Sequence, residues 1–282
     1  MSYIGLNAIT HDRPFDGLID RISITFFVKN SSEILDEATL LTNYKFDVGN
    51  LNVDSGPITI EAMSHNVYKS LSDNRSCALF NSSDSYFQTT GFTLLNSHQY
   101  ELSITFWLRL NIIAPLNDIN VIAILQLTSL IDGQLSSSYA CVFGLVVFPK
   151  NSTVGIHFPA VSPRIINVNN WIIENNTWVH LGIAYDGQDT FYFYKNGQLI
   201  GNNTQQQYST VILDDPRLAL AIGGVYFNDS DAQNSEIFKK MTCFAKASSF
   251  NYSTMDGEID ELMMFGRLLT QSEFVDLAHS QY

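Results

Sequence analysis

Short apolar segments separated by turn signals run along most of this chain, and they limit its fold more than any other feature of the sequence. Residues 101–110 alternate apolar and polar side chains, whereas residues 121–127 and 141–148 are nearly continuous apolar runs, as in strands that are covered on both faces. Asn196-Gly197 is a two-residue hairpin signal. Further strand signals lie at 44–46, 78–80, 86–87, 177–186, 191–195, 199–200 and 218–227. Many short strands with a turn signal about every 8–12 residues predict an all-β sandwich of antiparallel sheets.

Two segments of the chain, residues 15–38 and 255–278, repeat each other without a gap. Each begins with an Asp-Gly turn, continues as a short alternating strand and then carries a capping box followed by a short helix with an apolar face. The boxes are Asn30-x-x-Glu33 and Thr270-x-x-Glu273. The identical pairs are Asp16/Asp256, Gly17/Gly257, Ile19/Ile259, Asp20/Asp260, Ser32/Ser272, Glu33/Glu273, Asp36/Asp276 and Ala38/Ala278. The sequence therefore predicts a C-terminal helix around 271–279.

This repeat also predicts the domain organisation. If the strand-and-helix element ends a module, residues 39–282 hold one complete module. Residues 1–38 are then the orphan C-terminal fragment of a preceding repeat. We therefore expect a piece of a tandem array, with neighbouring repeats in a longer protein.

The composition excludes several classes of partner. The chain has 15 Lys and Arg against 28 Asp and Glu, which gives a net charge of −13. It therefore lacks the excess of basic residues with which proteins bind nucleic-acid phosphates and anionic lipids. The most apolar run, residues 121–131, carries polar residues and is too short to cross a membrane. We expect no nucleic-acid partner and no membrane insertion.

Asn-x-Ser/Thr sequons are about twice as frequent as chance predicts for a chain so rich in these residues. They begin at Asn30, Asn74, Asn81, Asn151, Asn175, Asn202, Asn228 and Asn251. The excess indicates a secretory history, because these sequons are the acceptors for N-linked glycans. We expect an extracellular or secretory protein, and a truncated start would explain why no signal peptide is visible.

Four motifs occur in a family-specific order along the chain. They are A-L-F-x-x-S-x-x-Y-F at 78–87, S-I-T-F-W-L at 103–108, T-W-V-H-L-x-I-x-Y-D-G at 177–187 and D-G-E-I-D-E-L at 256–262. In combination they resemble the laminin-G-like and pentraxin-like modules of the concanavalin A-like jelly-roll superfamily. The resemblance implies a two-sheet antiparallel jelly-roll sandwich with a short C-terminal helix. It also implies an extracellular, usually non-catalytic module whose ligands include glycans, proteins and calcium.

The resemblance further implies a disulfide. Cys141 and Cys243 lie where related tandem modules often carry a bonded pair. The alternative is that all three cysteines are reduced and buried. Cys77, which precedes a core strand, is expected to be a buried thiol.

The acidic run Glu258-Ile-Asp260-Glu261 is similar to the catalytic strands of concanavalin A-like glucanases, in which alternate carboxylates share one face. Glu258 and Asp260 share a face here, but strict alternation puts Glu261 on the other one, and Leu262 takes the next position. A glycoside hydrolase is therefore the weakest of the functional alternatives, and we expect no enzyme activity.

Calcium is the better candidate ligand, because related modules bring an aspartate near the first strand close to acids of the last one. By that likeness the candidate ligands are Asp54, Asp84, Asp256 and Asp260. The alternative is that these residues form turns and caps.

Trp107 and Trp178 lie in predicted strands and are expected in the core. Trp171 lies in a polar, Asn-rich segment and is the candidate for an exposed platform that binds ligand, but a place in the core is the favoured alternative. The leading hypothesis for the chain is a non-catalytic extracellular recognition and adhesion module that binds a glycan or an extracellular protein. A structural spacer in a repeat array is the runner-up.

Overall fold

The computed structural model of the chain describes residues 26, 28–47, 49–89, 92–93, 101–112, 120–129, 141–157, 165–188, 190–204, 217–223 and 251–280. The chain divides into two compact units, residues 1–35 and 36–282. Helix α1 (Ser31–Thr39) begins in the first unit and ends in the second. No helix among the described residues has the length and apolarity to span a bilayer.

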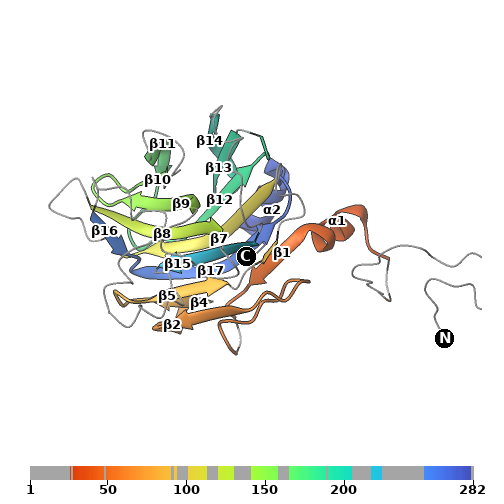
Figure 1. Cartoon of the computed structure of the whole chain (residues 1–282), viewed down its shortest axis with the longest axis horizontal. Helices are drawn as coiled ribbons and strands as arrows, with labels where there is room; N and C mark the ends of the chain where they lie inside the picture. The colour runs from red at the N-terminus through yellow and green to blue at the C-terminus, as the bar shows by residue number, and fades with distance from the viewer. Residues whose placement is uncertain are drawn as a thin grey trace, which may run out of the picture. The chain divides into compact units, whose positions relative to one another are not determined.

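The described strands form two sheets, and Figure 1 labels most of these strands. Sheet A has the order β14-β13-β12-β7-β17-β4-β3, with β1 also paired to β17. Its strands are β1 (Leu40–Tyr44), β3 (Val67–Ser72), β4 (Arg75–Phe80), β7 (Leu102–Leu110), β12 (Val179–Tyr185), β13 (Thr190–Lys195), β14 (Gln198–Thr204) and β17 (Gly257–Phe265).

Sheet B has the order β11-β10-β9-β8-β15-β5-β2, with β6 paired to β15 and β16 to β8. Its strands are β2 (Ala62–His65), β5 (Tyr86–Thr89), β6 (Phe92–Thr93), β8 (Asn120–Ser129), β9 (Cys141–Phe148), β10 (Thr153–His157), β11 (Ile165–Ile172), β15 (Arg217–Gly223) and β16 (Asn251–Thr254). All described pairings are antiparallel except β16 with β8. The predicted two-sheet sandwich is therefore confirmed.

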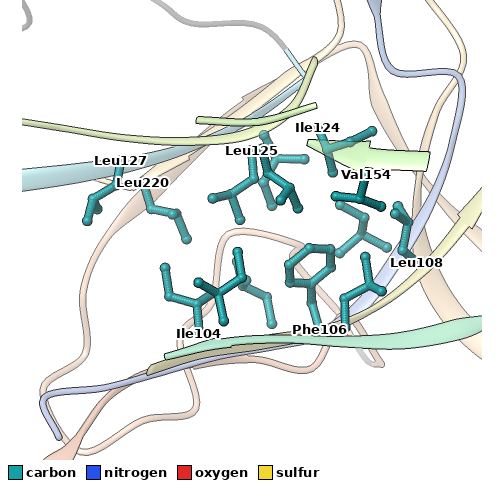
Figure 2. Packing of buried hydrophobic residues seen from close by; sticks show 14 of the residues in the cluster. Ile104, Phe106, Leu108, Ile124, Leu125, Leu127, Val154 and Leu220 are labelled. Carbon is teal, nitrogen blue, oxygen red and sulfur yellow. The ribbon is translucent and has the colours of Figure 1, made fainter. Parts of the chain in front are cut away.

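The core lies between the two sheets. Alternate residues of β7, among them Ile104, Phe106 and Leu108, are buried in one hydrophobic cluster with residues of sheet B. Figure 2 shows these three side chains facing Leu125 and Leu220 of the other sheet. Because β7 alternates so regularly, its remaining side chains point to the face of sheet A that is turned away from sheet B.

The C-terminal helix α2 (Gln271–His279) packs on sheet A through Phe274, which is fully buried. The Phe274 ring stacks on Tyr194 with 3.8 Å between ring centroids. It also lies so close to Gly182 that a Cβ there would be 2.5 Å from the ring, so only glycine fits. The helix and its capping box match the prediction.

Candidate functional site

A polar pocket of about 630 Å³ opens on sheet A near the β3–β4 turn. Its lining residues are Asp47, Asp73, Asn74, Arg75, Ser76, Asn176, Thr177, Trp178 and Asp260. Asp260 pairs in register with Trp107 of β7, and its neighbour Ile259 is in the core. The pocket therefore lies on the face of sheet A turned away from sheet B.

An ion pair with aromatic neighbours forms the floor of this pocket. Arg75 Nη1 lies 3.0 Å from Asp260 Oδ2, and the two side chains are only 10% and 1% exposed. The Arg75 guanidinium carbon lies 4.3 Å from the ring centroid of Trp107 and 5.4 Å from that of Trp178. Stacked rings and a buried carboxylate together compensate the desolvation of the guanidinium.

A second arginine ties the walls together. Arg109 Nη1 lies 3.2 Å from Glu258 Oε2 and donates to Ser72 Oγ, while its Nε donates to the carbonyl oxygen of Asn176 at 3.2 Å. The same guanidinium lies 3.7 Å from Asp73. One side chain of β7 thus holds both the β3–β4 turn and the segment before β12, so the walls are preorganised.

A β-bulge in β17 changes the predicted place of Glu261. Asp260 pairs with Trp107 but Met263 pairs with Thr105, so one extra residue enters β17. Glu261 takes a left-handed conformation there, with φ of 47°. Strict alternation fails at this point, and Glu261 is close enough to Asp260 for that carboxylate to act on its pKa.

Burial sets the titration of both carboxyls. It raises the pKa of Asp260 to about 6, although the Arg75 hydrogen bond and charge act in the opposite direction. Burial, and then the neighbouring charge of Asp260, raise the pKa of Glu261 to about 7. Asp260, which lines the pocket, and Glu261, which follows it in β17, therefore both have pKa values near neutral pH.

The rim of the pocket is acidic and exposed. Asp73 and Asn74 form the two-residue loop of the β3–β4 hairpin, with φ of 52° and 64° as a type I′ turn requires. Asp73 is 73% exposed, and Asp47 is exposed as well. Asn176, with φ of 58°, donates its N–H to the carbonyl oxygen of Leu110 and closes the opposite wall.

The structure does not gather the four aspartates proposed as calcium ligands. In the part of the chain that it describes, no group of three or more His, Cys, Asp or Glu is placed to hold a metal ion. Asp54 accepts backbone N–H bonds from Asn43, Gly56 and Ile60. Asp84, Asp256 and Asp260 accept bonds from Asn66, Asn111 and Arg75, respectively. Calcium binding rests on the sequence resemblance alone.

Trp171 is not the exposed ligand platform for which it was a candidate, and the favoured alternative, a place in the core, is correct. Trp171 is fully buried, and its ring centroid lies 5.4 Å from that of Phe193. The polar neighbours do not decide its exposure, because alternation in β11 sends successive side chains to opposite faces. Trp178, which is half-buried, lines the pocket instead.

The cysteine and glycosylation predictions are tested only in part. Cys77 is a buried free thiol, as predicted, and burial raises its pKa to about 12. Cys243 lies outside the described residues, so the Cys141–Cys243 bond stays a prediction. Asn228 also lies outside them, and so does the side chain of Asn251. The sequon asparagines at 30, 74, 81, 151, 175 and 202 are exposed, which leaves them accessible to glycans.

Sequence reasoning missed most of the pocket. The Asp73-Asn74 dipeptide between apolar segments is a hairpin signal that would have located the rim. Arg75 and Trp178 carry no such signal, because only the pairing of β4, β17, β7 and β12 brings them together.

Comparisons with known proteins agree with this fold. A family model described as the concanavalin A-like lectin/glucanases superfamily matches residues 81–274. A comparison with curated proteins finds no match. A structure of botulinum neurotoxin type C, whose cell entry depends on interaction with two ganglioside molecules, has a TM-score of 0.58 at 13% identity and covers 89% of this chain and 53% of its own.

Two further structures come from the same group of toxins. The binding domain of botulinum neurotoxin DC in complex with rat synaptotagmin II has a TM-score of 0.58 at 13% identity, covering 87% of this chain and 52% of its own. The serotype G binding domain has a TM-score of 0.54 at 17% identity, covering 86% and 51%. The chain spans about half the length of these structures, and identities this low show the fold alone. Since the family model covers well over half of the chain, the chain belongs to the concanavalin A-like lectin/glucanase superfamily.

Proposed function

We propose that the chain is a non-catalytic extracellular recognition module whose pocket on sheet A binds a glycan. The observation that carries this proposal is the composition of the pocket. A cavity of about 630 Å³ combines one aromatic wall, Trp178, with the polar side chains of Asp73, Asn74, Asn176 and Thr177. Sugars offer apolar C–H faces and many hydroxyls, so such a pocket can stack one face and bond the edges.

The rigidity of the walls supports binding. Arg109 links the two sides of the pocket, and Arg75 is fixed between Asp260 and Trp107. A site whose side chains are already held in place loses less conformational entropy when the ligand binds.

The state of the carboxylates supports a role without catalysis. Retaining and inverting glycosidases need one carboxylic acid and one carboxylate free to act on the sugar. Here Glu258 contacts Arg109 and Asp260 contacts Arg75, each within about 3 Å. Both carboxylates are thus engaged in ion pairs within the sheet.

The relatives support the general class of function. Domains of the laminin G-like type are typically extracellular. Of the toxin structures that share this fold, one is described as depending on two ganglioside molecules for cell entry and another is in complex with synaptotagmin II. By analogy of fold a glycan or a protein receptor is expected here, and the pocket favours the glycan.

Calorimetry with a panel of oligosaccharides that includes lactose and N-acetylchitotriose tests the proposal. We expect binding by the wild type and a loss of at least about tenfold in affinity for Trp178→Ala, because the stacking wall is removed. Tyr68→Ala is the matched control, since Tyr68 is a half-exposed aromatic of β3 that does not line the pocket.

Equal losses in both variants would contradict the assignment to the pocket. No binding by the folded wild type to any sugar of the panel would instead favour the alternative of a structural spacer.

A further inference from the structure

We propose that this pocket selects its ligand by charge and binds neutral and cationic sugars more tightly than glycans that carry sialic acid or sulfate. The inference rests on the proposed function and names the class of glycan. Two observations support this inference: the exposed position of the acidic groups at the rim, and the bonds that the nearby cations already make within the protein.

Among the charged residues that line the pocket, acidic ones outnumber basic ones. They include the carboxylates of Asp47, Asp73 and Asp260 against the single guanidinium of Arg75. Asp47 and Asp73 are exposed at the rim, where an entering ligand meets them first. The chain as a whole adds a net charge of −13, so the long-range field has the same sign.

The nearby cations are already held by protein groups. Arg75 is paired with Asp260, and Arg109 contacts both Glu258 and Asp73. Lys69 Nζ donates to the carbonyl oxygen of Asp47. Recognition of a sialic acid carboxylate needs a donor fork aimed at the ligand. The guanidinium groups of Arg75 and Arg109 instead bind carboxylates of the protein itself, those of Asp260 and Glu258.

Repulsion at the rim then sets the selectivity. A ligand carboxylate about 4 Å from one rim carboxylate loses about fivefold in affinity in water, and salt screens this effect. Two such contacts would together give about 25-fold, and because ions screen part of this repulsion we expect a penalty of about tenfold at low salt.

A measurement without any ligand tests the charge of the pocket directly. Trp107 and Trp171 are 4% and 0% exposed, so quenching of tryptophan fluorescence by ions reports mainly on Trp178. We expect caesium to quench the wild type well and iodide to quench it poorly. In Asp47→Asn/Asp73→Asn we expect the quenching constant for iodide to rise and that for caesium to fall. The ratio of the iodide constant to the caesium constant should then rise about threefold. Trp178→Phe supplies the background from the buried rings.

The control for net charge removes two carboxylates elsewhere. Glu61→Gln/Asp276→Asn changes the total charge by the same amount at exposed positions that do not line the pocket. If this variant moves the quenching ratio as much as the rim variant does, the selectivity belongs to the whole molecule and the proposal fails.

A matched pair of sugars tests the consequence for binding. We expect lactose to bind about tenfold more tightly than 3′-sialyllactose at low salt. The rim variant should reduce this difference to about threefold or less, and the control variant should keep it. Equal binding of both sugars by the wild type overturns the charge selectivity while leaving glycan recognition intact. Binding of no sugar of the panel, with the quenching pattern as expected, overturns the proposed function but not the acidity of the pocket.

Discussion

Glu261 and Glu273 lie in the same C-terminal strand-and-helix element, yet their surroundings move their pKa values in opposite directions. Burial raises the pKa of Glu261 from its ordinary value of 4.5 to about 7. Burial also acts to raise the pKa of Glu273, but the hydrogen bonds from Arg267 and Thr270 outweigh it and lower that pKa to about 2. The two side chains therefore give the fold opposite dependences on pH.

For Glu261 the folded state holds the proton more tightly than the unfolded state does. Its contribution to stability is present in full below pH 4.5 and is lost as the pH rises through 7. We predict that Glu261→Gln, which stays neutral, is more stable than the wild type by about 1–3 kcal/mol at pH 8 and about equal to it at pH 4. Urea unfolding at the two pH values measures this difference. An equal gain at both would show that ionisation is not its cause.

For Glu273 the sign is reversed. Its contribution is present above pH 4.5 and is lost as the pH falls through 2. We predict that Glu273→Gln costs about 1–2 kcal/mol at pH 7, a value reduced for the partial exposure of the side chain, and little at pH 2. The same unfolding series checks it, and a cost that persists unchanged at pH 2 would contradict the assignment.

Asp54 separates the two interpretations of the aspartates predicted as calcium ligands. Its carboxylate accepts three backbone N–H bonds and is 6% exposed, so it organises the segment after β1. We predict that Asp54→Asn lowers stability by about 1–3 kcal/mol, equally in calcium and in EGTA. Thermal melting of both proteins in both buffers measures this. A rise in the melting temperature of the wild type in calcium, absent from the variant, would instead restore the metal-binding interpretation.

The tryptophans show what residue-level patterns can and cannot predict. Trp107 and the buried thiol of Cys77 follow from apolar strand context and are correct. Trp171 was chosen for its polar neighbours and is buried, whereas Trp178 was assigned to the core and lines the pocket. Which tryptophan meets solvent depends on what covers each face of a sheet, and a single strand does not contain that information.

At the scale of elements, the repeated capping box has been preserved in both copies with different consequences. Asn30 and Glu33 exchange hydrogen bonds at the start of α1, and Thr270 and Glu273 do so at the start of α2. In α2 the apolar face is buried through Phe274. In α1 the corresponding residue, Ile34, is 57% exposed.

Equal caps should therefore differ in their effect on the fold. We predict that Thr270→Ala lowers the free energy of unfolding by about 1 kcal/mol, because α2 is packed on the core of the module. Asn30→Ala, the matched control, should leave global unfolding unchanged within about 0.5 kcal/mol. Denaturant unfolding of the two variants compares them, and a cost for Asn30→Ala as large as that for Thr270→Ala would show that α1 unfolds with the module.

Strands were predicted well where their side chains are apolar and poorly where they lie at an edge. The prediction for β9 is correct to the residue, and those for β7 and β8 differ from the structure by one or two residues at their ends. The missed strands are β2, β3, β6, β10, β11 and β16. β3 and β11 are polar edge strands, which backbone pairing stabilises without a regular apolar pattern. The bulge at Glu261 was missed for a similar reason, since register depends on the partner strand.

At the scale of the whole molecule, the module is joined to the end of α1 by Arg267. This side chain donates to Asp36, Thr39 and Glu273, and it is 11% exposed. We predict that removal of residues 1–29 leaves the melting temperature within about 2 °C, whereas removal of residues 1–39 costs about 1–3 kcal/mol by leaving a buried guanidinium short of partners. Calorimetry of the two truncated chains tests this, and equal melting temperatures would show that Arg267 needs only Glu273.

Asn74 has two roles that compete. It lines the pocket and it begins a sequon. A glycan attached there would stand at the mouth of the cavity beside Trp178. The choice of expression host then determines whether a binding assay measures an open or a covered pocket. Protein made in bacteria presents a vacant pocket, while protein secreted from a eukaryotic cell that modifies Asn74 carries its own sugar as a cover. Ser76→Ala abolishes the acceptor and retains the asparagine, and comparing it with the wild type made in bacteria shows what loss of the Ser76 hydroxyl itself changes in the pocket.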